Sequence, residues 1–161
     1  MGNEGTATLG TLGIDGTPPT LLATLEGPQS PGDGLTWVTS ATLVNITIED
    51  ATSGPAGIEY AFADTGPWTD YDPAESALFD GLAEGPLTLH YRGSDEAGNV
   101  ADAQSMRVGL DDSGPQVELE VAPSIVGGSA DQLVASPDSL VSFTADDGEG
   151  VGTEGIHYTI K

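Results

Sequence analysis

The chain contains no cysteine, so it has neither a disulfide nor a thiolate metal site. Basic residues are almost absent: Arg92, Arg107 and Lys161 stand against 26 acidic residues, and the formal net charge is −23. A nucleic-acid binder needs Lys and Arg to displace counterions from phosphates, and an anionic membrane surface repels such a chain. No apolar run approaches the roughly 18 residues of a membrane span. We therefore expect no nucleic-acid partner and no membrane insertion.

Hydrophobic residues make up 37% of the 161 residues, which suits thin cores better than one large core. About 150 residues is an ordinary length for one domain, so there is room for one domain and a fragment, or for two small domains. Glycine (23) and proline (11) are abundant, which indicates many turns. Residues 1–6 carry no basic and no apolar segment, so we expect no signal peptide there.

The sequence repeats itself at a nearly constant spacing. Three pairs of segments match 96, 97 and 98 residues apart: Gly13–Pro19 with Gly109–Pro115, Leu43–Thr47 with Leu140–Thr144, and Gly57–Tyr60 with Gly155–Tyr158. Insertions of single residues in loops explain the drift. A fixed period of this kind predicts a tandem array of one folding unit.

The frame of the repeat predicts the domain organisation. Residues 1–16 match the terminal strand and linker of a preceding repeat, 17–112 form one complete domain, and 113–161 form the first half of a second domain, up to its third strand. Two alternatives stay open. The chain is a native protein with two frayed ends, or identical chains complete one another by donating strands along a filament.

The hydrophobic period within 17–112 is two residues, as in a strand packed on one side. Val44, Ile46 and Ile48, for example, alternate with polar residues. No segment carries a helical stripe. We predict strands near 20–25, 35–38, 41–49, 57–63, 76–79, 87–94 and 101–110. About seven short antiparallel strands in fewer than 100 residues indicate an all-β fold, an immunoglobulin-like Greek-key β-sandwich.

Four motifs resemble a known group of domains. They are Ile-Glu-Tyr at 58–60, Gly-Pro-Trp-Thr-Asp-Tyr at 66–71, Gly-Pro-Leu-Thr-Leu-His-Tyr-Arg at 85–92 and Asp-Glu-Ala-Gly-Asn-Val at 95–100. Together they resemble the immunoglobulin-like repeat of secreted and cell-surface proteins of bacteria and archaea. The resemblance implies an extracellular or cell-surface location and a tandem architecture. The group is functionally broad, so the resemblance implies no particular activity.

An immunoglobulin-type topology brings certain acids to one pole: those of the linker before the first strand, of the loop after the second strand and of the last hairpin. These acidic and amide residues are Asp15, Glu49, Asp50, Asp95, Glu96 and Asn99 in the complete domain and Asp111, Asp112, Asp146 and Asp147 in the partial one. Crowded carboxylates repel one another, and Ca²⁺ accepts six to eight oxygen ligands in loose geometry. We expect calcium to stiffen the junctions, as the resemblance to giant bacterial adhesins implies. The open alternative is a set of solvated turn acids.

The acidity itself indicates a second property. A surface almost free of Lys keeps its hydration in concentrated salt, which is typical of halophilic proteins. Salt also screens the repulsion among 26 acids, so we expect stability to rise with ionic strength.

Catalytic motifs are weak. His90 and His157 have no nucleophile near them in sequence and are interpreted as surface residues, while 150–155 match the pattern G-x-G-x-x-G without a following helix. We therefore predict that the protein is not an enzyme. The sequon Asn45-Ile46-Thr47 places a glycosylation acceptor at Asn45, on an outward strand position.

Two functions follow from these patterns. The first is a non-catalytic structural or adhesive module of a stalk, surface layer or filament, with neighbouring repeats or identical subunits as partners, and a surface glycan or protein as a further partner. The second is a carbohydrate-binding accessory module of a secreted hydrolase, in which Trp37, Trp68 and Tyr71 form the ligand platform. If the chain is a stalk module, we expect the indole rings of both tryptophans to be packed. If it is a carbohydrate-binding module, we expect an exposed indole ring.

Overall fold

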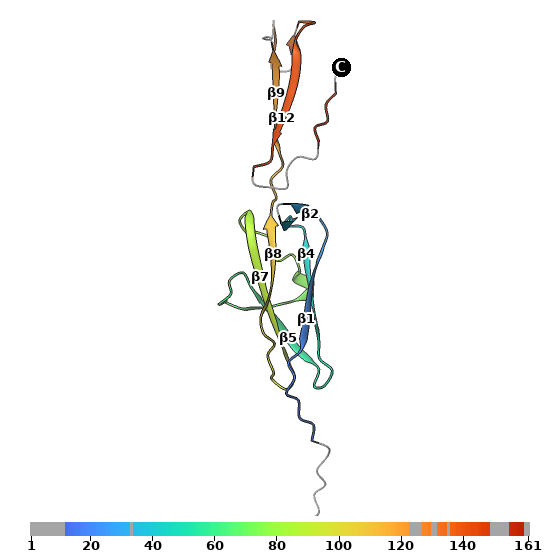
Figure 1. Cartoon of the computed structure of the whole chain (residues 1–161), viewed down its shortest axis with the longest axis vertical. Coiled ribbons are helices and arrows are strands. Elements are labelled where there is room, and N and C mark those ends of the chain that lie inside the picture. The colour runs from blue at the N-terminus through green and yellow to red at the C-terminus, as the bar shows by residue number, and fades with distance from the viewer. Residues whose placement is uncertain are drawn as a thin grey trace, which may run out of the picture. The chain divides into compact units, whose positions relative to one another are not determined.

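The computed structural model describes residues 12–148, apart from 33, 123–126, 130–131 and 135, and residues 155–159, with only the backbone described at 127–129 and 132–134. The described part is all-β and contains several sheets, as predicted (Figure 1). Its helical content is one short 3₁₀ turn, η1 (Pro73–Glu75). No helix among these residues is long and apolar enough to cross a membrane.

The chain divides into two compact units, each made of segments that are not consecutive in sequence. The first unit comprises Met1–Leu25, Val44–Ser76 and Thr88–Met106, and the second comprises Glu26–Leu43, Ala77–Leu87 and Arg107–Lys161. The predicted domain boundaries at 16/17 and 112/113 stay predictions.

In the first unit, β1 (Thr20–Glu26) and β4 (Leu43–Glu49) form a two-stranded sheet. The side chains of β4 alternate as its sequence predicts, because Val44 and Ile46 are buried and the residues beside them are exposed. Threonine hydroxyls of each strand donate to carbonyls of the other: Thr20 to Glu49, Thr24 to Asn45 and Thr47 to Leu22.

A second sheet of the first unit packs on this one. β5 (Pro55–Ala61) pairs antiparallel with β7 (Gly85–Asp95) and with the short β6 (Thr69–Asp70). A Cβ added at Gly93 of β7 would lie 2.6 Å from Cδ1 of Ile48 and 3.2 Å from Cδ2 of Leu21. The two sheets therefore meet face to face at a glycine that leaves room for both side chains.

The free edge of β4 is closed by Tyr71 and Ser76, two residues outside any strand. The buried Tyr71 hydroxyl donates to the Val44 carbonyl (2.8 Å) and accepts from the Ile46 N–H (3.2 Å). The Val44 N–H donates to the Ser76 carbonyl (2.8 Å).

The prediction of a strand at 76–79 is wrong, because the structure has no strand there. Asp72 caps η1, proline begins that turn, and irregular chain and a turn follow. Leu78 and Phe79 are both buried although they are adjacent, which the alternation of a one-sided strand does not allow.

In the second unit, β2 (Gln29–Gly32) and β3 (Leu35–Val38) form an antiparallel hairpin. β3 also pairs in parallel with β8 (Gln104–Leu110), with Trp37 opposite Gly109. The hydrogen-bonded order of the largest sheet is β2-β3-β8-β7-β5-β6. β2 and β6 were not predicted, because both are short and β2 contains a proline and a glycine.

The second unit also contains two small antiparallel sheets. One joins β9 (Gln116–Ala122) to β12 (Leu140–Asp146), and the other joins β10 (Gly127–Ser129) to β11 (Gln132–Val134). The third strand expected around 155–158 is wrong for the described residues, since 155–159 form no strand. The matching strand β5 is held by β6 and β7, and no described residue pairs with 155–159 in that way.

Two structural details recur 97 residues apart. The register of β2 with β3 (Ser30↔Trp37, Gly32↔Leu35) equals that of β10 with β11 (Gly127↔Val134, Ser129↔Gln132).

The turn that follows each hairpin also recurs. Thr39 N–H donates to Thr42 Oγ1 (3.1 Å) and Thr42 N–H to the Thr39 carbonyl (2.9 Å). Ser136 and Ser139 make the same two bonds, at 3.1 and 3.0 Å.

Candidate metal centre

Three of the predicted acids come together in the first unit. Asp15, Asp50 and Asp95 each offer a carboxylate oxygen, and these oxygens lie within 4.8 Å of one another. They belong to the linker before β1, the loop after β4 and the end of β7, which are the three segments that the topology was expected to bring to one pole. No second group of this kind occurs in the part of the chain that the structure describes.

Asp50 is held by the loop that it begins. Its Oδ1 accepts from the N–H groups of Thr52 (3.0 Å), Ser53 (2.9 Å) and Gly54 (2.8 Å). Gly54 has a φ of +90°, which favours glycine and lets the backbone turn its N–H toward the carboxylate. The loop therefore fixes the carboxylate before any ligand arrives.

Asp95 is the buried member of the group, with 2% of its surface exposed. Its Oδ1 accepts from the backbone N–H of Asn99 (2.8 Å) and its Oδ2 from Nδ2 of the same residue (2.7 Å). Asn99 Nδ2 also donates to the Asp15 carbonyl (3.4 Å). A burial this deep is costly for a carboxylate unless donors or a cation compensate its charge.

Asp15 ties the linker to the Asp50 loop. Its Oδ1 accepts from Thr17 N–H (3.0 Å) and its Oδ2 from Ser53 N–H (3.0 Å). Hydrogen bonds from the Ser53 side chain and from the N–H groups of Thr17 and Ser53 stabilise the ionised form, so the pKa of Asp15 is lower than its usual 3.8.

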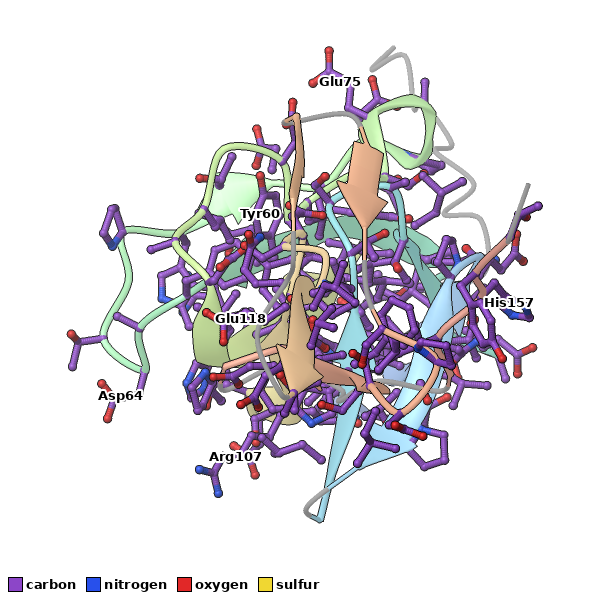
Figure 2. The ribbon with its side chains drawn as sticks, turned by 90° about the horizontal axis from the view of Figure 1, so that it is seen from above. Tyr60, Asp64, Glu75, Arg107, Glu118 and His157 are labelled. Atoms are coloured by element: carbon purple, nitrogen blue, oxygen red, sulfur yellow. The ribbon has the colours of Figure 1, made fainter. Side chains whose placement is uncertain are left out.

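The pKa of Asp15 makes a pH-dependent contribution to stability. Because the folded-state pKa is lowered, the contribution is full above about pH 3.8 and is lost as the pH falls through the lower folded value. We expect Asp15→Asn to melt below the wild type at neutral pH, and the gap to close in acid. Melting curves in EDTA check this, with Asp64→Asn as the matched change at an exposed loop (Figure 2). A difference in melting temperature that does not change with pH contradicts the lowered pKa of Asp15.

The chemistry of this group fits a hard cation. All three side chains are oxygen donors, and three carboxylates supply up to six of the six to eight oxygens that Ca²⁺ takes. At least five of these oxygens already accept an N–H. The two oxygens of Asp95 each accept one and keep a further lone pair, whereas Asp50 Oδ1 accepts three N–H groups, so a cation here has to bind Asp50 through Oδ2. Asn99 points its amide nitrogen at Asp95, so a cation here needs that amide turned to present Oδ1.

The other predicted metal ligands of the first unit lie outside the group. Glu49 and Glu96 are exposed, and Asn99 acts as a donor in the present arrangement.

The predicted acidic ligands of the second unit are distributed differently. Asp112 accepts from Ser40 N–H (2.8 Å), Asp111 from Ser113 N–H (3.2 Å) and Asp146 from Gly148 N–H (3.0 Å). Asp111, Asp146 and Asp147 line a cavity of about 530 Å³.

Sequence reasoning missed Glu84. Its Oε1 accepts from Asp112 N–H (3.0 Å) and from the Ser113 hydroxyl (2.7 Å), so Glu84 fixes the linker after β8. No sequence pattern pointed to it, because the contact joins residues 28 positions apart in an irregular segment.

The three aromatic residues of the predicted carbohydrate platform are not exposed together. Trp37 is 6% exposed, with its ring beside Gly32 and Gly109, and Tyr71 is the buried bridge on β4. Trp68 is half-buried, and the Arg92 guanidinium covers its ring at 4.2 Å.

The other residues predicted at the surface differ in their exposure. The side chain of Asn45 is exposed on β4, and His157 is exposed, whereas His90 is half-buried. Asp64, Glu75 and Arg107 are exposed and point away from the ribbon (Figure 2).

No protein-family model matches this chain, and neither a curated protein nor a solved structure matches it.

Proposed function

We propose that the chain is a non-catalytic structural module of an extracellular or cell-surface protein, built from tandem immunoglobulin-like Greek-key sandwiches. The observation that carries the proposal is the recurrence of the β2–β3 register in β10–β11, together with the same hydroxyl turn after each hairpin. Equal registers 97 residues apart are what two copies of one unit produce. Its partners are neighbouring repeats or identical subunits of a stalk, surface layer or filament.

The sheets support the sandwich. β1–β4 and the sheet containing β7 meet through apolar side chains at Gly93, and the largest sheet combines antiparallel hairpins with one parallel pair. Two antiparallel sheets with about seven short strands are the architecture of an immunoglobulin-like domain.

The pairing of β3 with β8 supports a role in bearing tension. Tension at the C-terminal end of β8 pulls this strand along its length past β3. The hydrogen bonds of the pair, around Thr36↔Val108 and Val38↔Leu110, are then stretched together and must break at once. A stalk needs this resistance, and an enzyme or an accessory domain does not.

Calcium suits the same role. A cation held by Asp15, Asp50 and Asp95 joins the linker to two loops of the domain that follows it, so bending at the linker then requires breaking metal–oxygen contacts. The ion supplies positive charge and rigidity, while the chain supplies the three carboxylates.

The carbohydrate-binding alternative finds less support. Stacking on a sugar ring needs an exposed aromatic face, and Trp37 and Tyr71 are buried in the packing of the strands. Arg92, paired with Glu59 at 2.8 Å, occupies one face of Trp68.

Single-molecule force spectroscopy tests the proposed function. The full chain, pulled from its two ends, is expected to unfold in a discrete peak. The matched control uses the same chain pulled through cysteines introduced at Leu35 and Arg107, which directly precede Thr36 and Val108, the first residues of the parallel pair β3–β8. This geometry opens the pair one bond at a time, so its peak is expected at lower force. End-to-end extension without a peak, or with a peak no higher than the control, contradicts a tension-bearing stalk.

A further inference from the structure

The residues before β1 match the last strand of the complete repeat. Leu12, Gly13 and Ile14 stand 96 positions before Val108, Gly109 and Leu110, the end of β8, and the linker residues that follow match as well. The two apolar residues differ in their surroundings. Val108 and Leu110 are 0% exposed, whereas Leu12 is 82% exposed and Ile14 88% exposed. Residues 12–14 therefore carry the apolar pattern of a core strand without a core around them.

β11 matches β3, but no described residue stands beside β11 in the place that β8 has beside β3. β3 lies between β2 and β8, with Thr36 opposite Val108 and Trp37 opposite Gly109. β11 stands at the same register to β10, but their sheet has only these two strands in the part of the chain that the structure describes. By the 97-residue spacing, Leu133 and Val134 occupy the positions of Thr36 and Trp37.

The sheet formed by β9 and β12 has an apolar face that this chain covers only in part, where Tyr158 stacks on Phe143 with the ring centroids 5.1 Å apart. Leu119 lies opposite Phe143 and Val121 opposite Val141, so these side chains share one face. Leu119 and Val141 are exposed, although the β4 residue matching Val141 is the buried Val44. In the first unit this kind of face is covered by a second sheet, as at Gly93.

From these three observations we infer that residues 12–14 of a second copy of this chain add to β11 as a parallel strand, in the place that β8 occupies beside β3. Leu12 then lies opposite Leu133 and Gly13 opposite Val134. The inference rests on the repeat in the proposed function. The contact joins the beginning of one chain to the later part of another, so it is heterologous and extends copies head to tail rather than closing a pair. The net charge of −23 opposes the approach of two copies, so association requires screening by salt.

Disulfide trapping between two single-cysteine variants tests the inference, because the natural chain has no cysteine. One variant is Gly13→Cys and the other is Val134→Cys with a mass tag. Opposed residues of neighbouring strands lie within the Cα separation that a disulfide spans. Nothing lies within 4 Å of a Cβ added at Gly13, so this change does not disturb the free chain. The control replaces Gly13→Cys with Gly57→Cys, whose added Cβ is equally unobstructed.

In molar salt, we expect the mixed disulfide of positions 13 and 134 to form at least tenfold faster than that of positions 57 and 134. Adding Leu12→Asp and Ile14→Asp to the first variant should reduce the rate to the control level. Equal rates in the two mixtures, or a rate that the aspartates leave unchanged, overturns the inference. An internal disulfide in a single chain that carries both cysteines also overturns the inference, because residues 12–14 then pair with β11 of their own chain and not with that of a second copy.

A second measurement covers the case in which Val134→Cys perturbs the fold. The cysteine-free chain is expected to associate with rising concentration in sedimentation velocity, and the Leu12→Asp, Ile14→Asp variant to stay monomeric. Leu22→Asp, a matched change at another exposed leucine, should associate like the wild type. A wild type that stays monomeric overturns the inference but leaves the force peak of the proposed function unaffected.

Discussion

Replacing Trp37 with alanine is expected to lower the free energy of unfolding by about 3–5 kcal/mol, the range for a large buried aromatic side chain. The indole is 6% exposed, and a Cβ added at Gly109 would lie only 2.5 Å from its Cε3 atom, so both glycines beside the ring are needed to seat it. Truncation leaves a cavity that strands cannot close without losing the β3–β8 pairing. Chemical denaturation at molar salt measures the loss.

Two companion variants separate packing from ligand binding. Trp37→Phe should lose less, partly because the buried Nε1 has no hydrogen-bond partner in the described part of the chain, so removing it sacrifices no bond. Trp68→Ala, at a half-buried position, should also lose less than Trp37→Ala. An accessory module for carbohydrate requires the reverse: little change in stability at Trp37 and a loss of polysaccharide binding.

Calcium is expected to raise the melting temperature of the metal-free chain, and Asp95→Asn to abolish most of that rise. A ligand that binds only the folded state stabilises it by about 2.7 kcal/mol at a hundred times its dissociation constant. Asp95 is the buried member of the group, and the change to asparagine removes one of the three carboxylates that would hold the ion. Calorimetry with EDTA and then with millimolar Ca²⁺ measures both effects.

Asp64→Asn is the matched control, because it removes the same charge from an exposed loop acid outside the group. Non-specific screening shifts the wild type and both variants alike, and that result contradicts a metal centre. A comparison with Mg²⁺ tests the selectivity of the site. Mg²⁺ demands near-octahedral coordination, and three carboxylates that already accept N–H groups offer an irregular arrangement of ligands.

The sequence was sufficient for the strands that alternate cleanly. In β4 and β7 the side chains have a period of two, and both were predicted to within a few residues. The segment around Leu78 and Phe79 failed because apolar content was interpreted as a strand, although Asp72 and Pro73 begin a 3₁₀ turn just before it. Local capping outweighed hydrophobic content there.

The candidate site was predictable at the level of segments but not of side chains. Topology indicated which three segments would meet, and it found Asp15, Asp50 and Asp95. Topology alone could not exclude Glu49 or Glu96 from the group. Membership of the group depends on which carboxylates the N–H groups of the loops hold in place, and topology does not determine this. Tyr71 shows the same limit: its hydroxyl bonds two backbone groups of β4, and no pattern in the sequence distinguishes such a bridge from a ligand-stacking tyrosine.

The reciprocal bonds of Thr39 with Thr42, and of Ser136 with Ser139, have a practical consequence for detecting relatives. The two turns share no identical residue, since Thr-Ser-Ala-Thr stands at one and Ser-Pro-Asp-Ser at the other. What is kept is a pair of hydroxyls three positions apart, just ahead of an alternating apolar strand. A search for that chemical pattern should therefore detect diverged copies that residue-by-residue alignment overlooks.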